Sequence, residues 1–154
     1  DYDRWDGDVM ANLTGPYLHA LAGDLLAMGV VIAGFKLGEL GFYSRISDQP
    51  QQLARLAGLN LDLDAWHGVE SWHPAFVVDV AGTTGAGDSA YAGFLAALLH
   101  GLDPQAALKT ACAVGACNVE AADSTAGVRT WEATQSRLQT DWPMSSLHLP
   151  DAPA

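Results

Sequence analysis

The chain has 154 residues, of which 49% are hydrophobic and 16% charged, a composition that favours one compact domain. Lysine and arginine number 7 against 18 aspartate and glutamate residues, and the formal net charge is −11. Nucleic acids and anionic membranes are bound through basic patches, and the longest apolar stretches, 25–35 and 90–99, are far shorter than the ~20 residues that span a bilayer, so we expect neither partner.

The first third of the chain predicts a helix followed by a hairpin. Residues 1–15 are acidic and turn-rich, and we expect them to be irregular. Residues 17–28 space leucine and methionine at helical intervals, and Gly29 ends that helix. Residues 30–35 form a short β-branched apolar run, which predicts a strand buried on both faces. Residues 42–45 are expected to pair back on it.

The rest of the chain predicts a second strand and three helices. Residues 47–72 have weak periodicity and predict a long excursion with a short helix or two. The elements that follow are a buried strand at 75–80, an apolar helix at 89–99 that Gly101 ends, a helix from Asp103-Pro104 to about Val119, a helix at 131–138 capped by Thr130, and an irregular tail at 142–154. This order indicates an α/β fold, and so few strands imply part of a larger sheet.

The two cysteines, Cys112 and Cys117, provide no disulfide framework, and neither they nor the five histidines show metal-ligand spacing. The acidic residues 1–8 do not follow a signal-peptide pattern. We therefore expect a cytoplasmic protein without a metal site of its own.

The chemistry is predicted at residues 82–88, GTTGAGD, between a strand and a helix. Gly85, Ala86 and Gly87 let backbone amides approach an anion at a helix start, where donors are unsatisfied. Asp88 beside such an anion site could accept a proton as a general base. The alternative is that Asp88 only caps the helix and the glycines only make the turn. The spacing fits neither a dinucleotide G-x-G-x-x-G nor a Walker A loop.

The segments TTGAGD at 83–88, AGFL at 92–95 and AVGA at 113–116 resemble the second signature of the ribokinase-like (PfkB-type) carbohydrate kinases. The KLGELG turn at 36–41 resembles that family's nucleotide-contacting turn. The resemblance covers about 18–140 and only the family's C-terminal half. It implies that residues 1–154 are a single partial domain, the C-terminal part of a three-layer α/β/α sandwich.

The resemblance implies ATP-dependent phosphorylation of a hydroxyl on a sugar or sugar-like substrate. Asp88 matches the family's catalytic base, and Gly85, Ala86 and Gly87 match its anion hole. Mg²⁺ would arrive with the nucleotide. The residues that the resemblance assigns to nucleotide binding are Lys36, Leu37, Gly38, Gly41, Thr84 and Cys112.

Three residues depart from the family pattern. Gly82 stands where an aspartate usually helps hold a monovalent cation, which argues against a K⁺ site. Cys112 replaces an asparagine near the adenine, and Lys36 replaces a small hydroxyl residue. A second hypothesis is therefore a non-catalytic nucleotide-binding or interaction module left from a truncated kinase. The sequence leaves open which sugar is used and whether the chain forms a homo-oligomer.

Overall fold

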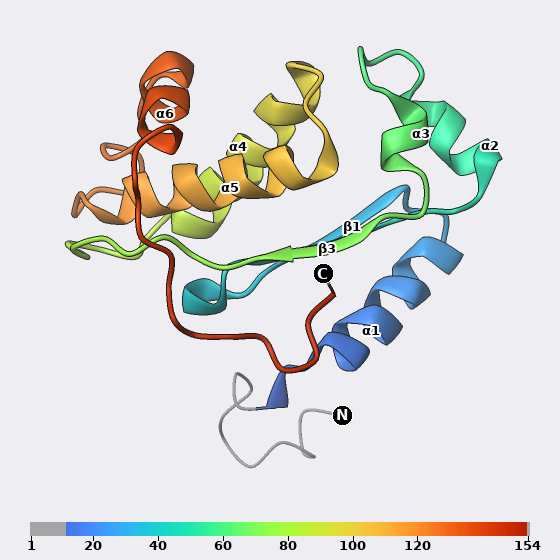
Figure 1. The fold of residues 1–154 in the computed structure, drawn as a ribbon, viewed down its shortest axis with the longest axis horizontal. Helices are drawn as coiled ribbons and strands as arrows, with labels where there is room; N and C mark the ends of the chain where they lie inside the picture. The colour runs from blue at the N-terminus through green and yellow to red at the C-terminus, as the bar shows by residue number, and fades with distance from the viewer. Residues whose placement is uncertain (1–11, 154) are drawn as a thin grey trace.

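The computed structural model describes residues 12–153. Its centre is a three-stranded antiparallel sheet in the order β1-β2-β3, formed by Ile32–Lys36, Phe42–Ile46 and Glu70–His73. Helix α1 (Gly15–Ala27) covers one face, and α4 (Ala86–Leu99) and α5 (Pro104–Val119) cover the other (Figure 1). This arrangement confirms the predicted α/β class.

The three layers follow from the alternation of side chains along β2. Phe42 and Ile46 lie in the hydrophobic cluster beneath α4 and α5. Tyr43, between them in sequence, lies in a second cluster with Leu18 and Ala22 of α1. Successive residues of a strand point to opposite faces, so β2 supplies side chains to both cores.

The predicted helix and hairpin at the start of the described chain are confirmed. The Thr14 hydroxyl caps α1 by accepting from the Tyr17 amide at 3.3 Å, and Gly29, with φ of 97°, follows its end. Strands β1 and β2 pair from Ile32 opposite Ile46 to Lys36 opposite Phe42. The short 3₁₀ helix η3 (Gly38–Leu40) closes the hairpin.

The middle segment contains the expected short helices, α2 (Pro50–Leu53), η4 (Ala54–Leu56) and α3 (Leu63–Trp66). Trp66 holds this segment in place, because the residue is 1% exposed and its indole nitrogen donates to the Leu102 carbonyl at 3.2 Å.

Helices α4 and α5 pack closely because small residues line their contact. A Cβ placed on Gly93 would lie 2.8 Å from Val114 Cγ2, and Ala97 and Ala107 are fully buried. As predicted, the Asp103 carboxylate caps α5 by accepting from the Ala106 amide at 2.9 Å. Helix α6 (Trp131–Leu138) begins after its Thr130 cap, also as predicted.

The strand predicted at residues 75–80 was wrong, and the third strand of the sheet was not predicted. Residues 75–80 form no strand beyond an isolated bridge from Phe76 to Met144, and Val80 is 62% exposed. The third strand is instead Glu70–His73, inside the predicted excursion. The chain leaves the ladder at Pro74, which has no amide hydrogen to donate, and an apolar run makes no strand without a partner alongside.

The prediction that the first strand is buried on both faces was also wrong. Only Ala33 of β1 is buried, because β1 is an edge of the sheet within residues 12–153. The tail after Trp142 is irregular, as expected, but Leu149 is fully buried against α1 and the sheet. Residues 1–11 lie outside the described residues. No helix in the described part of the chain is long and apolar enough to cross a membrane.

Candidate functional site

The turn before α4 has a backbone that requires glycine. Gly85 adopts φ of 77°, and a Cβ there would overlap the Ser124 carbonyl. The Ala86 amide donates to the Thr83 carbonyl at 3.3 Å and the Ser89 amide donates to the Gly85 carbonyl at 2.8 Å. The turn is therefore shaped both by its own hydrogen bonds and by the loop around residue 124.

This turn leaves backbone donors available at the start of α4. Within residues 12–153, the amides of Gly87 and Asp88 make no hydrogen bond with another backbone group. Such first-turn amides carry the positive end of the helix dipole and suit an anion. The Asp88 side chain stands beside them and is 90% exposed.

The structure brings the two motifs of the sequence together through Lys36 and Asp88. Lys36 ends β1, and its Nζ lies 3.4 Å from Asp88 Oδ1 although 52 residues separate the two. The Lys36 side chain also covers Gly87, because a Cβ on Gly87 would overlap it. Its ammonium lies 5.8 Å from the centre of the Tyr91 ring.

Tyr91, which the sequence analysis did not single out, fixes α4 to β1. Its hydroxyl donates to the Gly34 carbonyl at 2.7 Å, and its ring meets Phe42 edge-on at 5.2 Å. Burial raises the pKa of Tyr91, so the phenol stays protonated and keeps donating. The sequence could have pointed to Tyr91 through its position, because it follows Asp88 by three residues and so lies near the same side of the helix.

Asn118 supports the turn from the core. This fully buried side chain donates to the Thr84 carbonyl at 3.2 Å. Gly82, two residues before Thr84, packs against the backbone after α5. A Cβ on Gly82 would lie 3.1 Å from the Ala122 Cα and 3.2 Å from the Ala121 carbonyl oxygen. Any side chain at Gly82 would press on the residues just after α5, so the site has no room for an aspartate there without a shift.

An ion-pair cluster holds the segment after α5, and sequence analysis missed it as well. Glu120 accepts two hydrogen bonds from Arg137, at 2.6 and 2.7 Å, and one from Arg129 at 3.0 Å. These arginines, Arg137 first, lower the pKa of Glu120. The Arg137 guanidinium in turn stacks on the Trp142 ring at 3.7 Å. The cluster thereby ties α5 to α6 and to the tail.

The other residues assigned to nucleotide binding divide into two groups. Thr84 and Gly38 are exposed, whereas Leu37, Gly41 and Cys112 are buried. Cys112 donates its thiol to the His73 carbonyl at 3.5 Å, and burial raises the pKa of this thiol to about 12. A Cβ on Gly41 would overlap the same carbonyl, which explains the glycine. The exposed surface of the site is thus formed by Lys36, Gly38, Thr84 and the turn.

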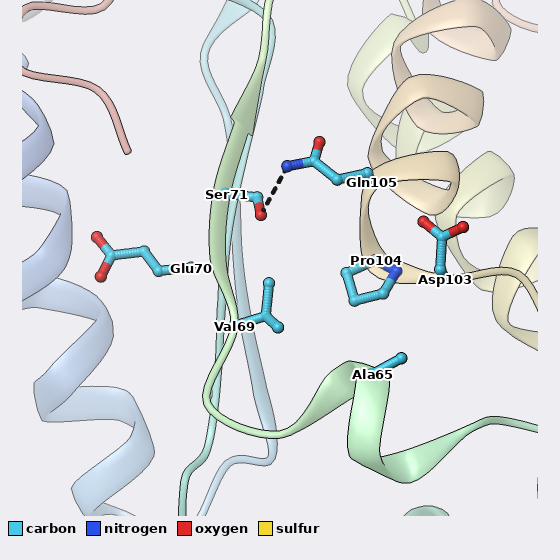
Figure 2. Close-up of a pocket in the computed structure, with 7 residues that line it drawn as sticks. All are labelled: Ala65, Val69, Glu70, Ser71, Asp103, Pro104 and Gln105. Atoms are coloured by element: carbon cyan, nitrogen blue, oxygen red, sulfur yellow. Dashed lines mark hydrogen bonds between the residues drawn. The ribbon is translucent and has the colours of Figure 1, made fainter. Parts of the chain in front are cut away.

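A separate hollow of about 480 Å³ lies between β3 and the start of α5 (Figure 2). Gln105 donates to the Ser71 hydroxyl across it at 3.1 Å. None of the predicted site residues lines it. In the described part of the chain, no three histidine, cysteine or acidic side chains are close enough together to hold a metal ion.

The comparisons with known proteins agree with the resemblance found in the sequence. Residues 65–131 match the model of the pfkB family carbohydrate kinases. No curated protein matches the chain. The resemblance to the ribokinase-like carbohydrate kinases is therefore confirmed through the family model.

Three solved structures illustrate the shared fold. Ribokinase from Thermotoga maritima is 22% identical with a TM-score of 0.60, over 79% of this chain and 34% of that one. Nucleoside kinase from Methanocaldococcus jannaschii is 24% identical with a TM-score of 0.55, over 71% and 30%. Aminoimidazole riboside kinase from Salmonella enterica, complexed with aminoimidazole riboside and an ATP analog, is 24% identical with a TM-score of 0.54, over 82% and 40%. The chain thus has part of the ribokinase fold and spans about a third of the length of the first two structures.

Proposed function

From its match to the pfkB family carbohydrate kinases, we propose that this chain carries the phosphoryl-transfer site of an ATP-dependent kinase acting on a hydroxyl of a sugar or sugar-like substrate. The observation that carries the proposal is the turn at the start of α4, where free amides, the Asp88 carboxylate and the Lys36 ammonium meet. One solved relative binds a riboside and an ATP analog, which supports this pair of substrates.

The geometry suggests a role for each group. The amides of Gly87 and Asp88 would hold oxygens of the transferring phosphoryl, within the anion hole of Gly85, Ala86 and Gly87. The Asp88 carboxylate would accept the proton of the attacking hydroxyl. As it does so, the hydroxyl oxygen bonds to phosphorus, and the bond from phosphorus to the leaving ADP oxygen breaks. A positioned base of this kind contributes about 10²–10⁴-fold to the rate.

The described residues support a proposal for how the site would use Mg²⁺ and K⁺. Since they offer no cluster of metal ligands, we propose that Mg²⁺ is held mainly by the phosphates of ATP. When bound there, the ion would reduce the repulsion between the nucleotide and a chain of net charge −11. A K⁺ site beside Gly82 is not part of the proposal, because the aspartate of the family motif is missing and a side chain there would require its neighbours to shift.

The cysteines support a proposal for the compartment. Cys112 and Cys117 are both free and buried thiols, which suits a reducing compartment, and we propose the cytoplasm.

The proposal is tested by comparing Asp88→Asn with Asp24→Asn, which changes another exposed acidic residue on a helix. We expect wild type and Asp24→Asn to bind MgATP in calorimetry and to release ADP when an acceptor from a panel of sugars and nucleosides is present. Asp88→Asn should retain ATP binding and its melting temperature but lose at least about a hundredfold in transfer rate.

Other outcomes distinguish the alternatives. ATP binding without acceptor-dependent ADP release by the wild type would favour the non-catalytic nucleotide-binding module. Full activity in Asp88→Asn would refute the role of Asp88, and a chain that does not bind ATP would refute both functions.

A further inference from the structure

The Lys36 side chain lies against the turn to which the proposed function assigns a phosphate. It lies over Gly87, and its ammonium is within 3.4 Å of the carboxylate proposed as the base. In the described part of the chain, no other lysine or arginine makes a polar contact with residues 82–88. The same cation thus faces both the anion turn and Asp88.

We propose that Lys36 is shared between two partners: it pairs with Asp88 while the site is empty, and it moves to a phosphate oxygen when a nucleoside triphosphate binds. This inference rests on the proposed function. The exchange would clear the space over Gly87 and release Asp88 for the acceptor hydroxyl. The Asp88 carboxylate, which is already exposed, would thereby be free of its ion pair only when a phosphoryl donor is present.

The contacts around Lys36 favour such an exchange. Its backbone is held by β1, where it pairs with Phe42, whereas its side chain is 49% exposed. The ion pair with Asp88 is exposed and long, and such pairs are weak, so little opposes its opening. A phosphate, with more negative charge and several acceptor oxygens, attracts an ammonium more strongly than one exposed carboxylate does.

The inference predicts that the effect of Asp88 on ATP affinity depends on whether Lys36 is present. Removing the Asp88 charge frees Lys36, so Asp88→Asn should tighten ATP binding. Part of this gain in ATP affinity comes from the loss of repulsion between the Asp88 carboxylate and the phosphates, and this part does not depend on Lys36. The remaining part requires the lysine and should be absent when Lys36 is replaced by methionine.

The experiment is a double-mutant cycle of Lys36→Met and Asp88→Asn, with Kd for ATP measured by calorimetry in the full chain. We expect Lys36→Met alone to weaken ATP binding about tenfold, as for loss of a charge-assisted hydrogen bond. The gain from Asp88→Asn should be about two- to fivefold larger with Lys36 present than without it, the range of an exposed ion pair.

Two controls isolate the phosphate contact. Lys109→Met removes another exposed lysine and should leave the Kd for ATP unchanged. Adenosine, which has no phosphate, should bind all four proteins of the cycle equally.

Two results would overturn the inference. If the gain from Asp88→Asn is equal in both backgrounds while ATP still binds and Asp88→Asn still abolishes transfer, the shared cation is refuted and the proposed function stands. If no variant binds ATP, both fail.

Discussion

The turn before α4 requires glycine at position 85, and Gly85→Ala tests this requirement. A residue with a Cβ at φ of 77° costs about 1–2 kcal/mol. The new Cβ would also overlap the Ser124 carbonyl, and such overpacking costs about 1–3 kcal/mol. We therefore expect a loss of about 3 kcal/mol, which for a chain of this size lowers the melting temperature by about 6–12 °C.

Two other glycines separate these contributions. Gly29 has φ of 97° but open space around its Cα, so Gly29→Ala includes only the conformational cost and should lower the melting temperature by about 3–6 °C. Gly58 has neither feature, and Gly58→Ala should stay within about 0.5 kcal/mol of the wild type.

The assay is thermal unfolding of the three variants followed by circular dichroism at 222 nm. We expect Gly58→Ala to have the highest melting temperature of the three variants, Gly29→Ala the next and Gly85→Ala the lowest. If Gly85→Ala melts with Gly29→Ala, the contact with Ser124 contributes nothing, and the inference that the loop around residue 124 shapes the turn is refuted.

Three further predictions concern the surroundings of the site. Because its arginine partners lower the pKa of Glu120, the stability that this pairing contributes is present above the ordinary glutamate pKa of about 4.3 and is lost as the pH falls through the lowered value. Glu120→Gln should lower the free energy of unfolding by about 2 kcal/mol at pH 7, and this difference from the wild type should disappear in strong acid. A difference in unfolding free energy that is the same at pH 7 and pH 3 would contradict the pairing. The Cys112 thiol, with its pKa raised to about 12, should not react with a disulfide reagent at pH 8 until denaturant is added, whereas rapid labelling of the native chain would show that it is accessible. Tyr91→Phe removes the 2.7 Å hydrogen bond to the β1 carbonyl and should cost about 1 kcal/mol in thermal unfolding, so an unchanged melting temperature would exclude a contribution from that bond.

Much of the fold could be predicted because its signals are local. The cap at Thr14, the Asp103-Pro104 start of α5 and the glycine turn before α4 are each determined by a few neighbouring residues. The turn of the candidate site was found for the same reason: a left-handed residue followed by free first-turn amides needs only glycine at the right spacing.

Strand identity could not be predicted from composition alone. Residues 75–80 have the apolar, β-branched character of a buried strand, yet they lack a strand partner in the described chain. Residues 70–73 lack that character and are a strand because their backbone pairs with β2, while the Glu70 carboxylate accepts a hydrogen bond from the Tyr43 hydroxyl. A ladder needs a neighbour, and which segments become neighbours is decided over long sequence separations.

The sequence by itself determined the helices, the hairpin, the glycine turn and the acidic residue at the head of α4. Only the tertiary structure decided that Lys36 lies over Gly87 and faces Asp88, and that Tyr91 joins α4 to β1. It also decided that Cys112 is buried and donates its thiol to the His73 carbonyl. The physical reason is distance along the chain: a turn or a cap is satisfied within a few residues, whereas these contacts join residues 39 to 57 positions apart, and only the packing of the two helices on the sheet brings them together.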